Sequence, residues 1–286
     1  MEKSIKKIES ILTNQFEQEL FEASIGCLKE MGNKIRFNNF AYSIRELSRH
    51  FLHRLAPEES VKSCIWFKQE TDNGKPTRAQ RIKYAIQGGI DDNLLELFGI
   101  KAEGLKKSAD AIKKSIDSLS KYTHINQEDF NLGDAEVATR STGILADFES
   151  FVEAMTSCRE QVMKLVDEKI EEEAINAVIS TSFENLDSMA QHYSMDEIYI
   201  LNYRVEEISA DEIVVAVEGE VGVTLSWGSN SDRRNGDGHD VEDTFPFSTR
   251  VRYCIGEDFP HDDPEVDEPG VDTSKWNINP EDEYLE

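Results

Sequence analysis

The sequence has little of what a metal centre, a disulfide framework or a membrane anchor requires. Only four cysteines occur in 286 residues, and they are too far apart to match the spacing of a metal site. No apolar run is long enough to cross a bilayer, and the opening MEKSIKKIES lacks the apolar region of a signal peptide. We therefore expect a cytoplasmic protein with reduced, mostly buried thiols at Cys27, Cys64, Cys158 and Cys254.

Further absences narrow the possible chemistry. The sequence contains no P-loop, no GxSxG nucleophile motif and no zinc-type cluster. Lysine is absent from residues 170–274, so a metal nuclease that places an acid-x-Lys motif on a strand of that region is disfavoured. These absences are compatible with a protein that uses no metal and no cofactor.

Charge is distributed unevenly along the chain, whose formal net charge is -26. Residues 1–130 contain 21 Lys and Arg against 19 Asp and Glu, whereas residues 131–286 contain 10 against 38. Because phosphate binding depends on positive side chains, any contact with nucleic acid is expected in the first half. The acidic half favours solubility, docking of a basic protein partner or restraint of the first half.

Hydrophobic periodicity predicts an α+β protein in three parts. Residues 1–190 show helical spacing and form a helical domain, with helices expected over 2–31, 36–55, 58–67, 78–87, 91–98, 101–122 and 134–179. Alternating β-branched and aromatic residues in 191–256 predict three or four antiparallel strands, with a tight turn at Ala210 and Asp211. The acidic, proline-containing tail 257–286 is expected to be loosely ordered.

The stretch RFNNFAYSIRELSRHFLHRLAP, residues 36–57, is the clearest helix. Asn38 or Asn39 is expected to cap its start, and Pro57 prevents it from continuing much further. Its apolar face comes from residues at three- and four-residue steps: Phe37, Phe40, Ala41, Ile44, Leu47, Phe51, Leu52 and Leu55.

The polar side of this helix concentrates arginine and histidine. At about 100° per residue, Arg45, Arg49 and His53 align beside the apolar face. Glu46 and His50 follow round the helix. Guanidinium groups bind phosphate in a forked geometry and histidine titrates near neutrality, so these residues suit phosphodiester chemistry. The alternative is structural, because Arg and His on an amphipathic helix also serve as salt-bridge partners.

Two other segments carry candidate site residues. A basic group that includes Arg78, Arg81 and Lys83 is predicted on a helix capped by Thr77. The glycine-rich segment 228–243 joins two strands, and its Asp232, Asp237, Asp240 and Asp243 could ligate Ca²⁺ or Mg²⁺. Their spacing does not match an EF-hand, so we favour a loop braced by Asp–Arg pairs and Asx-turns, with no metal.

The Arg-x4-His pair formed by Arg45 and His50 resembles the motif of HEPN-type ribonucleases, which are all-helical domains. The resemblance implies metal-independent RNA cleavage through the RNA's own 2′-OH, with His50 moving protons and Arg45 holding the phosphate. It also implies a homodimer, in which a second copy completes the site. Ideal geometry separates Arg45 and His50 by about 140° round the helix, and the pair lies in mid-helix, which departs from a simple match.

A wider set of segments resembles bacterial predicted pPIWI-associating nucleases, which are thought to belong to anti-phage defence clusters. The segments are IRELSRHFLHRLAP, IWF, GKPTRAQRIKYAIQGG, KYTHIN, GSNSDRRNGDG and DTFPF. The resemblance implies that the substrate-binding residues near Arg45 and His50 are Arg78, Arg81, Lys83, Lys121 and His124.

These observations give one leading hypothesis and one alternative. The leading hypothesis is a defence-associated, metal-independent RNA endonuclease with catalytic residues Arg45, His50, Arg49 and His53. The helical half would bind RNA or another nucleic acid, and the chain would form a homodimer. The alternative is a non-enzymatic subunit of a defence complex whose acidic half binds a protein partner.

Overall fold

The structure is a computed structural model of the chain. It describes residues 2–119, 125–181, 192–227, 239–256 and 264–277, together with residues 183, 186, 189 and 259. As predicted, these residues form an α+β protein in which helices precede an antiparallel sheet. The chain divides into two compact units, residues 1–163 and 164–286, and the division falls within the long helix α8.

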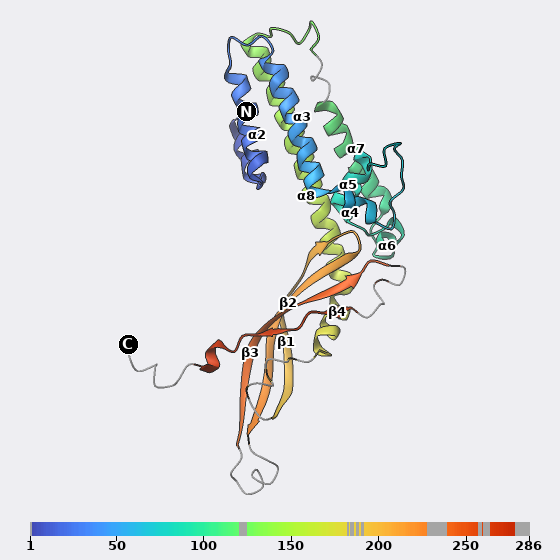
Figure 1. Ribbon diagram of the computed structural model, residues 1–286, viewed down its shortest axis with the longest axis vertical. Coiled ribbons are helices and arrows are strands. Elements are labelled where there is room, and N and C mark those ends of the chain that lie inside the picture. Colours follow the sequence, from blue (N-terminus) through green and yellow to red (C-terminus); the bar gives the residue numbers. More distant parts are fainter. Residues whose placement is uncertain are drawn as a thin grey trace, which may run out of the picture. The chain divides into compact units, whose positions relative to one another are not determined.

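Helices make up the first unit (Figure 1). The predicted bounds of the helices over 36–55, 78–87 and 134–179 are confirmed. The described helices are α1 (Glu2–Ile11), α2 (Gln15–Lys29), α3 (Arg36–Leu55), α4 (Glu58–Ser63), α5 (Arg78–Gln87), α6 (Asp92–Leu97), α7 (Ala102–Leu119) and α8 (Asp134–Ile179).

Two predictions about the first helices are wrong. The segment 2–31 is two helices rather than one, because Asn14 accepts a hydrogen bond from the backbone N–H of Glu17 at 3.2 Å and so caps a new start. Neither Asn38 nor Asn39 caps α3, which already begins at Arg36. Asn38 lies buried inside the helix. Its polarity was not a sufficient signal for a helix start.

The apolar face of α3 forms the centre of the first unit. Phe40, Ile44 and Leu47 are completely buried, and Phe51 meets Phe151 of α8 edge to face at 5.9 Å between ring centroids. α3 also packs against α2, α5 and α7, and Figure 1 shows α2 and α3 side by side. The burial of one face fixes which residues of α3 remain free to face other helices or solvent.

The start and end of α5 are fixed by local interactions. Thr77 accepts from the backbone N–H of Gln80, whose side chain in turn accepts from the backbone N–H of Thr77, which completes a capping box. Gly88 ends the helix with φ of 60°, a conformation that glycine adopts without the steric cost of a Cβ. These two devices fix where α5 begins and ends, and Arg78, Arg81 and Lys83 lie within these bounds.

The second unit is built on the antiparallel order β1–β2–β3–β4, with β5 also paired to β3. The strands are β1 (His192–Ile208), β2 (Glu212–Trp227), β3 (His239–Cys254), β4 (Glu265–Val266) and β5 (Gly270–Val271). Alternate residues of β2, such as Val215, Val217 and Val221, are completely buried. The tight turn predicted at Ala210 and Asp211 is present, with Ser209 accepting from the backbone N–H of Glu212 at 3.0 Å.

Gly219 marks a close approach within the sheet. A Cβ at this position would lie 2.3 Å from the carbonyl oxygen of Tyr199 and 2.7 Å from the Phe247 ring. No side chain can therefore be added there unless the backbone of β1 shifts.

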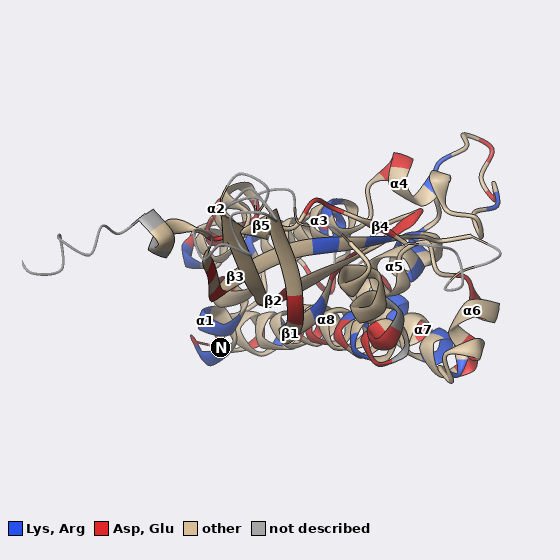
Figure 2. Cartoon of the chain, turned by 90° about the horizontal axis from the view of Figure 1, so that it is seen from below, with Lys and Arg blue, Asp and Glu red and all other residues tan. Residues whose placement is uncertain are grey.

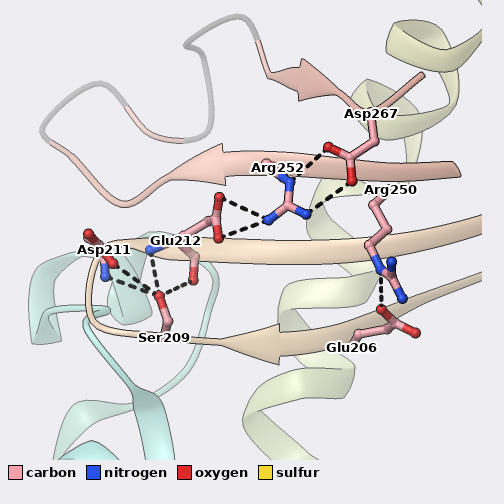
Figure 3. A network of polar contacts seen from close by, with 7 residues as sticks. All are labelled: Glu206, Ser209, Asp211, Glu212, Arg250, Arg252 and Asp267. Atoms are coloured by element: carbon pink, nitrogen blue, oxygen red, sulfur yellow. Dashed lines mark hydrogen bonds and ion pairs between the residues drawn. The ribbon is translucent and has the colours of Figure 1, made fainter. Parts of the chain in front are cut away.

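Ion pairs cross the polar side of the sheet (Figure 3). Arg252 on β3 donates to both carboxylate oxygens of Asp267 at 2.9 and 3.0 Å, and lies 3.3 Å from Glu212 on β2. Arg250 donates to Glu206 on β1 at 2.9 Å. The prediction of a loosely ordered tail is wrong for residues 264–277, because Arg252 and the pairing of β4 and β5 with β3 hold this segment on the sheet.

A search of the described helices found none with a stretch both long and apolar enough to span a membrane.

Candidate functional site

A cavity of about 180 Å³ lies in the first unit among α3, the segment before α5, α5 itself and α7. Figure 2 shows Lys and Arg in blue on α3 and α5. The described residues that line the cavity include four arginines and one histidine but no Asp or Glu: they are Arg45, Ser48, Arg49, Leu52, His53, Pro76, Arg78, Arg81 and Ile116. The cavity is therefore a candidate anion site.

Helical spacing accounts for the contribution of α3. Arg45, Arg49 and His53 recur at steps of four, so they share one side of the helix, as the sequence predicts. The buried apolar face of α3 directs this side toward α5 and α7. α5 supplies Arg78 and Arg81, which are three residues apart and therefore neighbours on its surface.

Three carboxylates next to the cavity hold its four arginines. Glu46 lies 2.8 Å from Arg49 and 3.9 Å from Arg45, so one acid serves two guanidiniums. Asp117 of α7 pairs with Arg78, and Glu58 of α4 lies 3.7 Å from Arg81. This leaves the cluster with more positive than negative groups, which favours a bound phosphate.

Arg81 is the fixed cation of this cluster. Its side chain is only 5% exposed, and its guanidinium donates to the backbone carbonyl of Ala56, just beyond the end of α3. Burial lowers the pKa of Arg81, while Glu58 raises it, and arginine remains charged throughout the physiological range. Arg81 therefore ties α5 to the end of α3 and places a permanent positive charge at the cavity.

His53 is the titrating group of the cavity. Partial loss of solvent around the ring lowers its pKa, and the positive charges of Arg81, Arg49 and His50 lower it further, against a smaller opposing effect of Glu58. A neutral imidazole is consequently favoured near pH 7. A neutral imidazole can accept a proton, which is what a general base requires.

His50 lies outside the set of residues that line the cavity. Its ring meets Phe16 of α2 edge to face, with 4.9 Å between centroids, and its Nε2 lies 3.1 Å from a terminal nitrogen of Arg49. The structure thus brings together Arg45, Arg49 and His53 but does not join His50 to them in the cavity. His50 contacts the cavity lining through Arg49, and its charge also acts on His53.

The remaining predicted residues are also separated. Lys83 leaves α5 on another side, where it pairs with Asp92 at 2.8 Å and does not line the arginine cavity. Lys121 and His124 lie outside the described residues. Arg54 donates twice to the buried Glu17, at 2.9 and 3.1 Å, so it ties α3 to α2.

Only part of the aspartate-rich segment falls within the described residues. Asp232 and Asp237 lie outside them, whereas Asp240 accepts from the Ser226 hydroxyl at 2.7 Å and Asp243 accepts from the backbone N–H of Thr244 at 2.8 Å. In the part of the chain that the structure describes, no group of three His, Cys, Asp or Glu side chains is placed to hold a metal ion.

Sequence reasoning missed four residues of the cavity: Ser48, Leu52, Pro76 and Ile116. Leu52 and Ile116 belong to apolar faces whose edges reach the cavity. A sequence pattern predicts such a face but does not indicate which of its residues border a cavity. Ser48, buried three residues after Arg45, could have been noticed as a polar residue among apolar positions.

Comparison with known proteins places the chain in a family. No curated protein and no solved structure matches the chain. Two family models do match, and both carry the description predicted pPIWI-associating nuclease. The first covers residues 9–148, which include the whole arginine cavity, and the second covers residues 155–277. The chain therefore belongs to the family of predicted pPIWI-associating nucleases.

Proposed function

We propose that the chain is a metal-independent endoribonuclease that uses the reaction expected of the HEPN type with a different histidine as base, and that the arginine-lined cavity holds the phosphodiester to be cut. The observation that carries the proposal is a histidine of lowered pKa beside four guanidiniums. The family description supports a nuclease in general. The defence role and the homodimer implied by the resemblance remain predictions.

In the proposed reaction, neutral His53 takes the proton from the RNA 2′-OH. The 2′ oxygen then forms a bond to phosphorus, and the bond from phosphorus to the 5′ oxygen breaks. The leaving oxygen takes a proton from water, and protonated His53 gives its proton to the hydroxide that remains. The products are a 2′,3′-cyclic phosphate and a 5′-hydroxyl. Arg45, Arg49 and Arg78 stabilise the negative charge that grows on the phosphoryl oxygens, and Arg81 provides a fixed charge behind them.

This assignment moves the general base from His50 to His53. His50 packs against Phe16 and contacts Arg49, so it is assigned a positioning role for that arginine. Substitution of His53 and substitution of His50 should therefore change the cleavage rate by different amounts, although the two residues are only three positions apart on the same helix.

The decisive experiment is RNA cleavage in the presence of EDTA by the wild type and by His53→Ala, His50→Ala and His192→Ala. His192 is an exposed histidine on β1 and serves as a matched control outside the cavity. We expect His53→Ala to lose about 10²–10⁴-fold in cleavage rate, His50→Ala to lose much less and His192→Ala to be unchanged. Circular dichroism establishes that each variant is folded.

Two results would overturn the proposal. Cleavage that requires a divalent metal would exclude the mechanism, and cleavage insensitive to His53→Ala would exclude the site. Replacing the ribose at the cleaved position by deoxyribose tests the chemistry independently, because the proposed reaction cannot occur without a 2′-OH. Product analysis should show a cyclic phosphate terminus.

A further inference from the structure

A second, larger cavity lies in the same unit and is not used by the proposed reaction. Its volume is about 500 Å³, and it is bordered by α5, α6, α7 and residues 66–70. Gln80, Lys83 and Gln87 of α5 line it, whereas Arg78 and Arg81 line the arginine cavity. At about 100° per residue, these two sets lie on opposite sides of α5. One helix thus separates the two cavities.

Trp66 provides an aromatic wall of this second cavity. Its indole N–H donates to the carbonyl oxygen of Gly88 at 3.0 Å, which fixes the edge of the ring at the end of α5. The amine of Lys83 lies over the ring, 4.9 Å from its centroid, and pairs with Asp92 at 2.8 Å. Because Trp66, Lys83 and Asp92 all line the cavity, the ring face that the ammonium covers is on the cavity side.

The other walls combine apolar surface with a few polar groups. Ile86, Leu105 and Ala109 contribute apolar side chains. The buried amide of Gln80 is held by Thr77 and by the carbonyl of Lys68, and the amide of Gln87 donates to Ile90 and Asp92, so these polar groups are fixed in direction. Lys68 and Lys106 are exposed side chains of the lining. Apolar walls with a small number of oriented polar groups are typical of small-molecule sites.

We propose that this cavity binds a nucleobase, stacked on Trp66 in the place now taken by the Lys83 ammonium. Stacking on an aromatic side chain suits every base, so this recognition does not depend on one particular hydrogen-bonding edge. The displaced Lys83 and the exposed Lys68 and Lys106 are then available to the phosphate that the nucleotide carries. Acids also border the cavity, at Glu70, Glu103 and Asp110, so an uncharged ring fits its interior better than a phosphate.

The base can come from a bound RNA strand or from a free nucleotide. An α-helix with its side chains is about 10 Å across, so an RNA whose phosphate occupies the arginine cavity could place a nearby base in the second cavity by passing round α5. In that case the inference rests on the proposed function and adds a base-reading pocket to it. A free nucleotide would instead be an effector, and its binding does not require that the chain cut RNA.

The test is calorimetric titration of the full chain with the four 5′-ribonucleoside monophosphates and with short single-stranded oligoribonucleotides. Two substitutions, Ala109→Phe and Ala79→Phe, fill the cavity from α7 and α5 respectively. Ala111→Phe is the matched control, because Ala111 is exposed on α7 and does not line the cavity. Oligonucleotides are titrated against the His53→Ala background so that cleavage does not interfere.

We expect the cavity-filling substitutions to weaken binding by roughly tenfold or more, and Ala111→Phe to leave it unchanged. Ribose 5-phosphate, which lacks a base, should not compete. Binding of monophosphates identifies a free nucleotide as ligand, whereas binding of oligonucleotides alone identifies a base of the RNA. Failure of both ligands to bind, or binding unaffected by both cavity-filling substitutions, would overturn the proposal. Oligonucleotides that fail to bind would count against the nuclease site as well, and RNA cleavage by the wild type and by His53→Ala then tells the two failures apart.

Discussion

The arginines of the two units are neutralised to different degrees. On the sheet, Arg252 contacts two carboxylates, Asp267 and Glu212, and Arg250 and Arg204 share Glu206 at 2.9 and 3.6 Å. On the sheet three arginines therefore meet three carboxylates, whereas at the cavity four arginines meet three, and Arg45 and Arg49 share Glu46. The sheet arginines are thus structural cross-links between strands, whereas the cavity arginines keep capacity for an anion.

This difference follows the composition of the units. Residues 1–163 contain 23 Lys and Arg against 25 Asp and Glu, while residues 164–286 contain 8 against 32. The net charge of -26 would suggest that the protein repels nucleic acid everywhere. A phosphate responds mainly to the charges near its own cavity and less to the net charge of the chain, because salt screens more distant charges over about 10 Å.

The comparison is tested most strongly by removing two arginines from each unit. We expect Arg45→Ala with Arg49→Ala to reduce RNA cleavage by about 10²–10³-fold, because both stabilise transition-state charge in the proposed mechanism. The matched pair Arg250→Ala with Arg252→Ala should leave the cleavage rate per folded molecule nearly unchanged. Rates measured at equal folded concentration check this contrast, and equal losses in both pairs would contradict it.

Helix α3 shows which parts of the site could be predicted from the sequence. Periodicity gave the bounds of the helix and the alignment of Arg45, Arg49 and His53, because both follow from 3.6 residues per turn. The position of His50 was not predictable, since it depends on Phe16 in another helix. Contacts between helices set this part of the site, and spacing within one helix carries no information about them.

The same limit applies to α5 and to the tail. Arg78, Arg81 and Lys83 look equivalent in sequence, yet Asp117, Ala56 and Trp66 lie near different members of the group and give them different environments. The two-residue strands Glu265–Val266 and Gly270–Val271 are too short for a period-two pattern, and they form only because β3 offers a paired edge.

A second prediction concerns the stability supplied by Arg81. Replacing it by Met keeps much of the volume but leaves the carbonyl of Ala56 without its guanidinium donor. We expect a loss of about 2–3 kcal/mol in the free energy of unfolding, the usual cost of leaving a buried group unsatisfied after removing a charged hydrogen bond. Arg252→Met, at a third-exposed surface pair, should cost clearly less. Urea unfolding of both variants decides which arginine is the more important for stability.

The pH dependence of cleavage is the third prediction. The lowered pKa of His53 means that its protonation, which removes the general base, occurs below the ordinary histidine value of 6.5. The acid limb of the rate profile should therefore lie below pH 6.5. Arg49→Gln removes one of the charges that lower this pKa, so it should shift the acid limb to higher pH as well as reduce the rate. An unshifted limb would show that His53 is not the titrating base.

The smallest expected effect is a change in how stability depends on pH. It contrasts His53 of the first unit with Asp167 of the second. Asp167 of α8 accepts from the backbone N–H of Val205 at 2.8 Å, and burial raises the pKa of its carboxyl group despite that hydrogen bond. The folded state therefore holds this proton more tightly than the unfolded state. Its contribution to stability is full below the ordinary value of 3.8 and is lost as pH rises through the raised pKa. His53 has the opposite sign, because its lowered pKa makes stability fall as pH drops below 6.5.

Asp167→Asn isolates the first of these effects. The amide oxygen can still accept from Val205, but the side chain no longer titrates, so the decline in stability above pH 3.8 should flatten. Glu168→Gln is the matched control, since it removes a neighbouring charge that raises the Asp167 pKa without touching Val205. In urea unfolding across this pH range, the wild-type free energy of unfolding should fall relative to that of Asp167→Asn as pH rises, and the fall should be smaller in Glu168→Gln. A wild-type slope retained in Asp167→Asn would assign the titration to another carboxylate.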